Sequence, residues 1–118
     1  MPDLPLRIEA LPGSRPGVRV LKLEGPLTLP NSFDFQDLVR ADRQNSLIVD
    51  LSEVPYIDST GIGCLVNGYV SHQNAGQNLL LVGVAERVQV CMRVTHVEKL
   101  FPTFPTVAEA EKSVAANS

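Results

Sequence analysis

Apolar and polar residues alternate near the start of the chain, as they do in strands that are buried on one face. This pattern predicts strands at residues 6–10 and 18–24, joined by the hairpin connection 11–17, which is rich in Pro and Gly. Two later runs, 47–51 and 79–84, are almost entirely apolar, which is typical of strands covered on both faces. A short last strand at 100–104 contains Pro102 and is therefore expected at an edge of the sheet.

Helices are predicted wherever apolar residues recur three and four positions apart. The first is expected to open at Asn31 or Ser32, either of which can cap it. The second is expected to end at Gly76, the third to begin near residue 85, and the fourth to begin with a capping box at Thr106. The positions expected to face the core are Phe35, Leu38, Val39, Ile62, Leu65, Val66, Tyr69, Val70, Val88, Cys91, Met92, Val107, Ala110 and Val114.

The predicted order β-β-α-β-α-β-α-β-α indicates an α/β fold, a mixed β-sheet with parallel pairs and with helices packed against it. We expect one domain over residues 1–118, with its core at about 6–114 and a fraying tail at 115–118. Right-handed crossovers bring the loops that follow the strands to the carboxyl edge of the sheet, where open α/β sheets tend to bind ligands.

The overall composition narrows the classes of function. The chain is 44% hydrophobic, enough for one buried core, and its formal net charge of −3 argues against a nucleic-acid-binding protein. No apolar run reaches the roughly 18 residues of a membrane span, and the first residues lack the layout of a signal peptide, so we expect a cytoplasmic protein. Cys64 and Cys91 are expected to be buried thiols in a reducing compartment. His72, expected to be exposed, and His96 have no metal-ligand spacing, so no metal site is predicted.

The most informative segment is the turn at 56–63, which joins the apolar strand 47–51 to the second helix. Ser59 falls at the mouth of that helix, where free backbone N–H groups and a partial positive charge favour an anion. Three interpretations are open for Ser59: a helix cap, a catalytic nucleophile and a phosphorylation site.

A cap at Asp58 or Ser59 would suit the residue types, because Asp and Ser are both favoured N-cap residues. A cap alone does not account for Gly61 and Gly63, since each glycine inside a helix costs about 1 kcal/mol relative to Ala. The two glycines suggest that something comes close to the backbone there.

A nucleophile would need a base within hydrogen-bond reach. His72 lies on the same helix, about 20 Å along its axis from Ser59 at roughly 1.5 Å per residue, and His96 falls near the end of the next helix. The turn is not Gly-x-Ser-x-Gly, and no Gly-Lys-Ser/Thr phosphate loop follows a strand. The sequence therefore argues against an enzyme. Phosphorylation of Ser59 would instead add about −1.5 to −2 charges at a helix mouth that tolerates them.

Residues 47–63, with the order Asp58-Ser59-Thr60-Gly61-Ile62-Gly63, resemble the motif of the STAS domain, the fold of bacterial anti-sigma-factor antagonists. Further similarity lies at 25–28, 79–83 and 101–110, so that the resemblance covers residues 6–114.

The resemblance implies a non-enzymatic partner switch in transcription regulation. In this family the serine corresponding to Ser59 is phosphorylated by an anti-sigma-factor serine kinase, which the unmodified antagonist binds, and a serine phosphatase resets the switch. The partner-binding residues implied are Asp58, Ser59, Thr60, Gly61, Ile62 and Thr28. ATP and Mg²⁺ would belong to the kinase, so that no cofactor is expected in this chain.

Thr28 departs from the family pattern, in which many phosphorylated members carry an acid at this position. Thr28 favours an alternative, a constitutive STAS interaction module such as an accessory subunit of a transporter or of a signalling assembly. The sequence leaves the oligomeric state open, a homodimer included.

Overall fold

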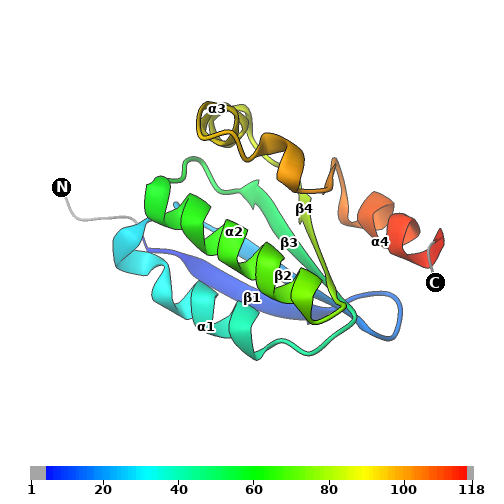
Figure 1. Cartoon of the computed structure of the whole chain (residues 1–118). Coiled ribbons are helices and arrows are strands. Elements are labelled where there is room, and N and C mark those ends of the chain that lie inside the picture. The colour runs from blue at the N-terminus through cyan, green and yellow to red at the C-terminus, as the bar shows by residue number, and fades with distance from the viewer. Residues whose placement is uncertain (1–4, 117–118) are drawn as a thin grey trace.

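The computed structural model describes residues 5–116, and it arranges them as one sheet with helices on both faces (Figure 1). The strands are β1 Arg7–Pro12, β2 Val18–Glu24, β3 Ser46–Glu53, β4 Asn78–Val82 and β5 Thr103–Phe104. The helices are α1 Phe33–Ala41, α2 Ser59–Asn74, α3 Glu86–Val94 and α4 Val107–Ala116, with short 3₁₀ helices η1 Leu29–Asn31 and η2 Glu98–Leu100. The predicted α/β class and the predicted order of strands and α-helices are confirmed.

The sheet has the spatial order β1-β2-β3-β4-β5. β1 is antiparallel to β2, and all other neighbours are parallel. The loops that follow β2, β3 and β4 therefore meet at one edge, the carboxyl edge of the parallel strands. The last strand lies at the sheet edge as predicted, but it is shorter, because residues 98–100 form η2 instead. The tail 115–118 was expected to fray, but residues 115 and 116 continue α4. Residues 117 and 118 and the N-terminal residues 1–4 lie outside the described residues.

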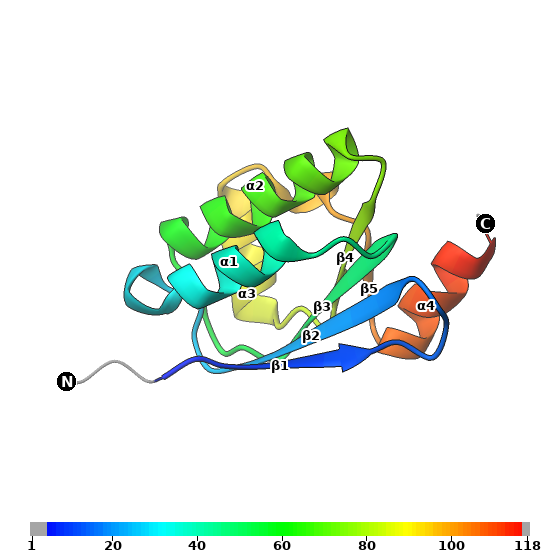
Figure 2. The ribbon, with the colours of Figure 1, turned by 90° about the horizontal axis from the view of Figure 1, so that it is seen from below.

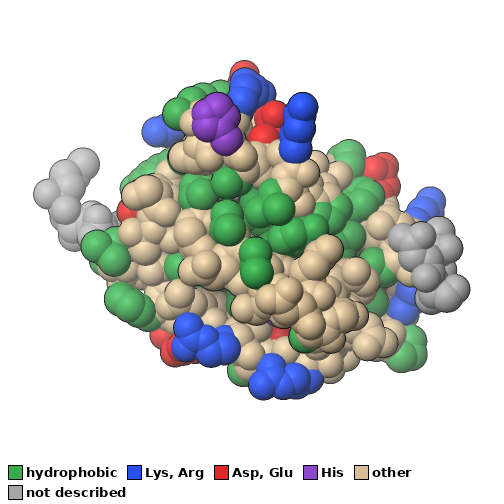
Figure 3. Space-filling model, in the orientation of Figure 1, with side chains coloured by type: hydrophobic (Ala, Val, Ile, Leu, Met, Phe, Trp, Pro, Cys, Tyr) green, Lys and Arg blue, Asp and Glu red, His purple; other side chains and the backbone are tan. Residues whose placement is uncertain are grey.

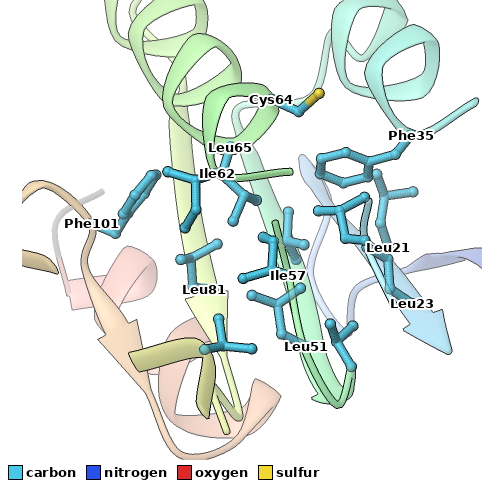
Figure 4. Close-up of a cluster of buried hydrophobic side chains, with 14 of the residues drawn as sticks. Leu21, Leu23, Phe35, Leu51, Ile57, Ile62, Cys64, Leu65, Leu81 and Phe101 are labelled. Carbon is cyan, nitrogen blue, oxygen red and sulfur yellow. The ribbon is translucent and has the colours of Figure 1, made fainter. Parts of the chain in front are cut away.

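The main core lies between the sheet and α1, α2 and α3 (Figure 2). Figure 4 shows how Leu21 from β2, Leu51 from β3 and Leu81 from β4 meet Ile62 and Leu65 of α2. On the surface beside this core, hydrophobic side chains gather between α2 and the segment that follows α3 (Figure 3), where Tyr69 packs edge-on against Phe101.

Of the helices that the structure describes, α4 lies on the opposite face of the sheet and packs over β3, β4 and β5. The smaller core on this face consists of Val18, Val20, Ile48, Leu80, Val82 and Ala110. The register places Glu9, Lys22 and Asp50 side by side on β1, β2 and β3, further along the same face. The face is thus apolar beneath α4 and charged on the strands toward β1.

A pair of hydrogen bonds fastens α4 to the opposite end of the chain. Glu111, buried on α4, accepts from the backbone N–H of Ser14 at 2.7 Å and from the Ser14 hydroxyl at 2.8 Å. Ser14 lies in the β1–β2 hairpin loop, so the first hairpin and the last helix hold each other in place.

On α1 and α2, the exposure of three side chains differs from what the sequence predicted. Leu38 was expected in the core but is 39% exposed, and Val70 is 45% exposed. His72, which was expected to be exposed, is buried at 3%. His72 is buried because α2 contacts α1 as well as the sheet. The two helices lie so close that a Cβ atom at Gly68 would come within 2.9 Å of Val39.

His72 is held by polar neighbours in this second contact. Its Nδ1 lies 3.0 Å from the carbonyl oxygen of Gly68, and its Nε2 lies 3.7 Å from the carboxylate of Asp42. Arg19 of β2 approaches the same carboxylate at 3.4 Å. The contact between the end of α2 and the loop after α1 is therefore made by polar side chains, those of His72, Asp42 and Arg19.

Candidate functional site

Asp58 is the N-cap of α2 and links that helix to η1. Its extended backbone (φ −102°, ψ −177°) turns the chain out of the loop after β3 and into the helix. One carboxylate oxygen accepts from the backbone N–H of Gly61 at 2.8 Å, and the other accepts from the N–H of Leu29 at 3.0 Å. A single carboxylate thus satisfies free N–H groups at the start of two helices.

The backbone of Leu27 clamps the loop between β3 and α2. Leu27 bridges Ile57 in parallel, its N–H donates to the carbonyl of Tyr56 at 3.3 Å, and its carbonyl accepts from the N–H of Asp58 at 3.3 Å. A Cβ atom at Gly61 would lie 2.3 Å from the Leu27 carbonyl oxygen. The close approach that the glycines suggested therefore occurs within the chain at Gly61. At Gly63 a Cβ atom would meet nothing within 4 Å.

Ser59 is the first residue of α2, and its side chain is exposed. Within residues 5–116 its hydroxyl makes no hydrogen bond, because Asp58 performs the capping. Thr60 is half-buried beside it. The hydroxyl of Ser59 is therefore available at the N-terminus of a sixteen-residue helix, where an added anion would meet the positive end of the helix dipole.

Ile62 and Thr28, two other residues of the predicted site, occupy different environments. Ile62 is 5% exposed and belongs to the main core, so its side chain does not reach the surface. Thr28 is half-buried, and Asn31 Oδ1 accepts from its backbone N–H at 2.8 Å and from its hydroxyl at 3.2 Å. Thr28 therefore stabilises the start of η1, where Asp58 also binds the N–H of Leu29.

Two exposed hydrophobic side chains near this turn had not been predicted as part of the site. Leu29, whose N–H binds Asp58, is 55% exposed, and Phe33 at the start of α1 is 62% exposed. The residue pattern at 29–33 gave no regular period that would have marked them. A contact that was also not predicted is a cation–π interaction, in which the guanidinium of Arg87 lies over the ring of Tyr56, 5.5 Å from its centre.

Cys64 lies one turn into α2, and its sulfur points away from the strands of the core (Figure 4). Burial raises the pKa of the Cys64 thiol. A hydrogen bond with Ser32 lowers this pKa, and the nearby charge of Asp58 raises it further. Cys64 and the half-buried Cys91 are both free thiols.

Neither histidine lies beside Ser59 in the described part of the chain, residues 5–116. His72 lies near the far end of α2 and is engaged by Gly68, and His96 follows the end of α3. Among residues 5–116, no group of three or more His, Cys, Asp or Glu side chains could hold a metal ion. No helix in that part of the chain is both long and apolar enough to cross a membrane.

The sequence profile of the STAS domain matches residues 13–110. The chain belongs to the STAS domain family. This match includes the loop after β2, the Asp58-Ser59 turn and the first turn of α4.

Individual STAS proteins extend the comparison. Over 70 residues, 59% of this chain, the sequence is 31% identical to a Thermotoga neapolitana protein provisionally named an anti-sigma factor antagonist, and the match spans 62% of that relative. A crystal structure of a Thermotoga maritima protein, provisionally given the same description, has a TM-score of 0.84 at 24% identity, covering 92% of this chain and 94% of that one. A sulfate transporter family protein from Wolinella succinogenes has a TM-score of 0.70 at 21% identity, covering 86% and 89%. The two solved structures show that the fold is shared.

Proposed function

We propose that this STAS domain is an anti-sigma-factor antagonist, a non-enzymatic partner-switch protein. In its unmodified form it binds an anti-sigma-factor serine kinase, and phosphorylation of Ser59 by that kinase releases it. A serine phosphatase restores the unmodified form. The observation that carries the proposal is the exposed hydroxyl of Ser59, which makes no hydrogen bond to any residue in 5–116 while Asp58 caps the helix.

The geometry allows a large change in surface charge with a small change in the fold. A phosphoryl group on Ser59 adds about −1.5 to −2 charges, and the N-terminus of α2 offers it a favourable dipole. The Asp58 carboxylate keeps its two N–H partners, so the turn need not rearrange. ATP and Mg²⁺ come from the kinase, and the chain contributes only the accepting hydroxyl.

Release of the partner follows from the surroundings of Ser59. Leu29 and Phe33 offer exposed apolar surface. Leu29 is hydrogen-bonded to Asp58, the neighbour of Ser59, so a partner that covers Leu29 would also cover Ser59. A phosphoryl group there would lose its water without gaining a matching cation, which weakens binding. Asp58, Ser59 and Thr60 supply polar contacts, whereas Gly61 and Ile62 contribute through the shape of the turn.

The test uses the anti-sigma-type kinase encoded in the same genome, with ATP, and reads the intact mass of the antagonist. One phosphate is expected on the native chain and on Thr60→Ala, and none on Ser59→Ala. Ser59→Asp should weaken kinase binding while the melting temperature stays nearly unchanged. Phosphate that persists in Ser59→Ala, or Ser59→Asp that binds as tightly as the native chain, would contradict the proposal.

A constitutive STAS interaction module, in a transporter or signalling assembly, is the second candidate. It is favoured by Thr28, which is uncharged and whose hydroxyl is engaged by Asn31, where many phosphorylated members carry an acid. The sulfate transporter family protein with the same fold makes this class relevant. No phosphate on Ser59 with any such kinase, together with stable binding to a transporter component, would establish this candidate instead.

A further inference from the structure

β1 has an open outer edge. Among the described strands it pairs with β2 alone, and it is the outermost of these strands (Figure 2). In the hairpin, the N–H of Gly13 donates to the carbonyl of Val18 at 2.8 Å, which fixes the alternation of hydrogen-bonded pairs along the two strands. By this alternation the backbone groups of Ile8 and Ala10 point away from β2, and Pro12, which has no N–H, lies on the same outward side.

We propose that a second copy of this chain pairs with this edge, β1 against β1, so that the two sheets become one. Two identical strands related by a twofold axis run antiparallel. The centre of the pairing must be a residue whose backbone groups point outward, and Ile8 opposite Ile8 of the second copy meets this condition. The main-chain hydrogen bonds of such strand addition provide the affinity.

The charges of β1 select this register. With Ile8 at the centre, Arg7 lies opposite Glu9 of the second copy, in the closer of the two kinds of antiparallel pair. The pairing also lengthens the row of charges on the sheet. From one copy to the other the row reads Glu24, Arg7, then Glu9, Lys22 and Asp50 of the second copy, and these five charges alternate in sign. Beyond Glu24 the row ends at Glu53 on β3, which repeats the negative sign. A register centred on Ala10 would place Glu9 opposite Leu11 and make no such pairs.

The apolar side of β1 supports the same register. Leu6 and Ile8 face the main core, and Leu6 comes to lie opposite Ala10 of the second copy. Next to Ala10 is a hollow of about 340 Å³ under the C-terminal half of α1. Its walls are apolar at Leu21 and Leu38 and charged at Arg19, Asp42 and Arg43. Leu6 of the second copy lies at its mouth. This position also accounts for the exposure of Leu38, which the helical pattern had placed in a core.

Sedimentation of the full chain over a range of concentrations tests the proposal, and we expect a reversible monomer–dimer equilibrium. Arg7→Glu and Glu9→Arg each place like charges opposite one another twice, and each should weaken the dimer about tenfold or more. A mixture of the two variants restores opposite charges at both positions, so the mixed dimer should form again.

Ala10→Pro provides a test that does not depend on charge. It removes an outward N–H and leaves the bonds to β2 intact, so it should abolish the dimer while the circular dichroism and the melting temperature stay close to those of the native chain. A native chain that is monomeric at all concentrations would overturn the proposal. A dimer that is unchanged in Ala10→Pro, or single charge variants that are not rescued by mixing, would also overturn it.

Discussion

Asp58 and Leu29 are 29 positions apart in the sequence and are joined by a hydrogen bond of 3.0 Å between a carboxylate oxygen and a backbone N–H. Because the other oxygen of Asp58 caps α2, its removal affects two helices. We expect Asp58→Ala to lower the free energy of unfolding by about 1–2 kcal/mol, as measured by urea denaturation. Ser59→Ala removes an exposed hydroxyl that has no hydrogen bond among the described residues, so it should stay within about 0.5 kcal/mol of the native chain. An equal loss in both variants would mean that Ser59 shares the capping.

The two glycines at the start of α2 should respond in opposite directions to the same substitution. Gly61→Ala places a Cβ atom 2.3 Å from the Leu27 carbonyl oxygen, so the loop must shift, and we expect a loss of about 1–3 kcal/mol. Gly63→Ala meets nothing within 4 Å, and it should stabilise the protein by about 0.5–1 kcal/mol because Ala favours the helix. Thermal unfolding of the two variants side by side measures both effects.

Gly63→Ala also tests for a contact with a partner. If the kinase packs against this part of α2, the variant should bind it more weakly although the fold is more stable. Unchanged binding would place Gly63 outside the contact surface.

His96 adopts a left-handed backbone with φ 62°, directly after the last turn of α3. Only glycine takes this conformation without steric cost. We therefore expect His96→Gly to raise the free energy of unfolding by about 1 kcal/mol. His96→Ala keeps the strain and should give no gain, so a gain of the same size in both variants would assign the effect to loss of the imidazole instead.

The Cys64 thiol should react slowly with iodoacetamide near neutral pH, because burial raises its pKa and the thiolate is the reactive form. Since the pKa is raised in the folded chain, the associated stability is complete below the pKa of the unfolded thiol. It is lost as the pH rises through the folded value. The Cys91→Ser background isolates Cys64, and Asp58→Asn should speed its reaction by removing a charge that raises the pKa. A rate equal to that of the unfolded chain would contradict the assignment.

The periodic pattern predicted the order of the elements, and β2 has the same bounds in the structure as in the prediction. It also placed Asp58 and Ser59 at the mouth of a helix, because an apolar strand, a turn and a helical period follow one another there. These features depend on residues that are neighbours in the sequence, so they can be predicted from one sequence alone.

The features that were missed depend on neighbours in space. His72 is buried because α1 packs against α2, and nothing in the local sequence indicates that contact. The reason for Gly61 is a carbonyl of the loop after β2, and the exposure of Leu29 and Phe33 follows from the path of η1. A pattern of apolar residues indicates which side chains can be buried, and the arrangement of the elements decides which of them are.

The hydrogen bonds between Ser14 and Glu111 join residues 97 positions apart. During synthesis on a ribosome, the first hairpin emerges long before the helix that covers the second face of the sheet. Ile48 and Leu80 stay open to water, and to chaperones, until that helix has left the exit tunnel. This domain therefore completes its fold only after α4 has emerged, and a product truncated before Glu111 should be a substrate for proteolysis.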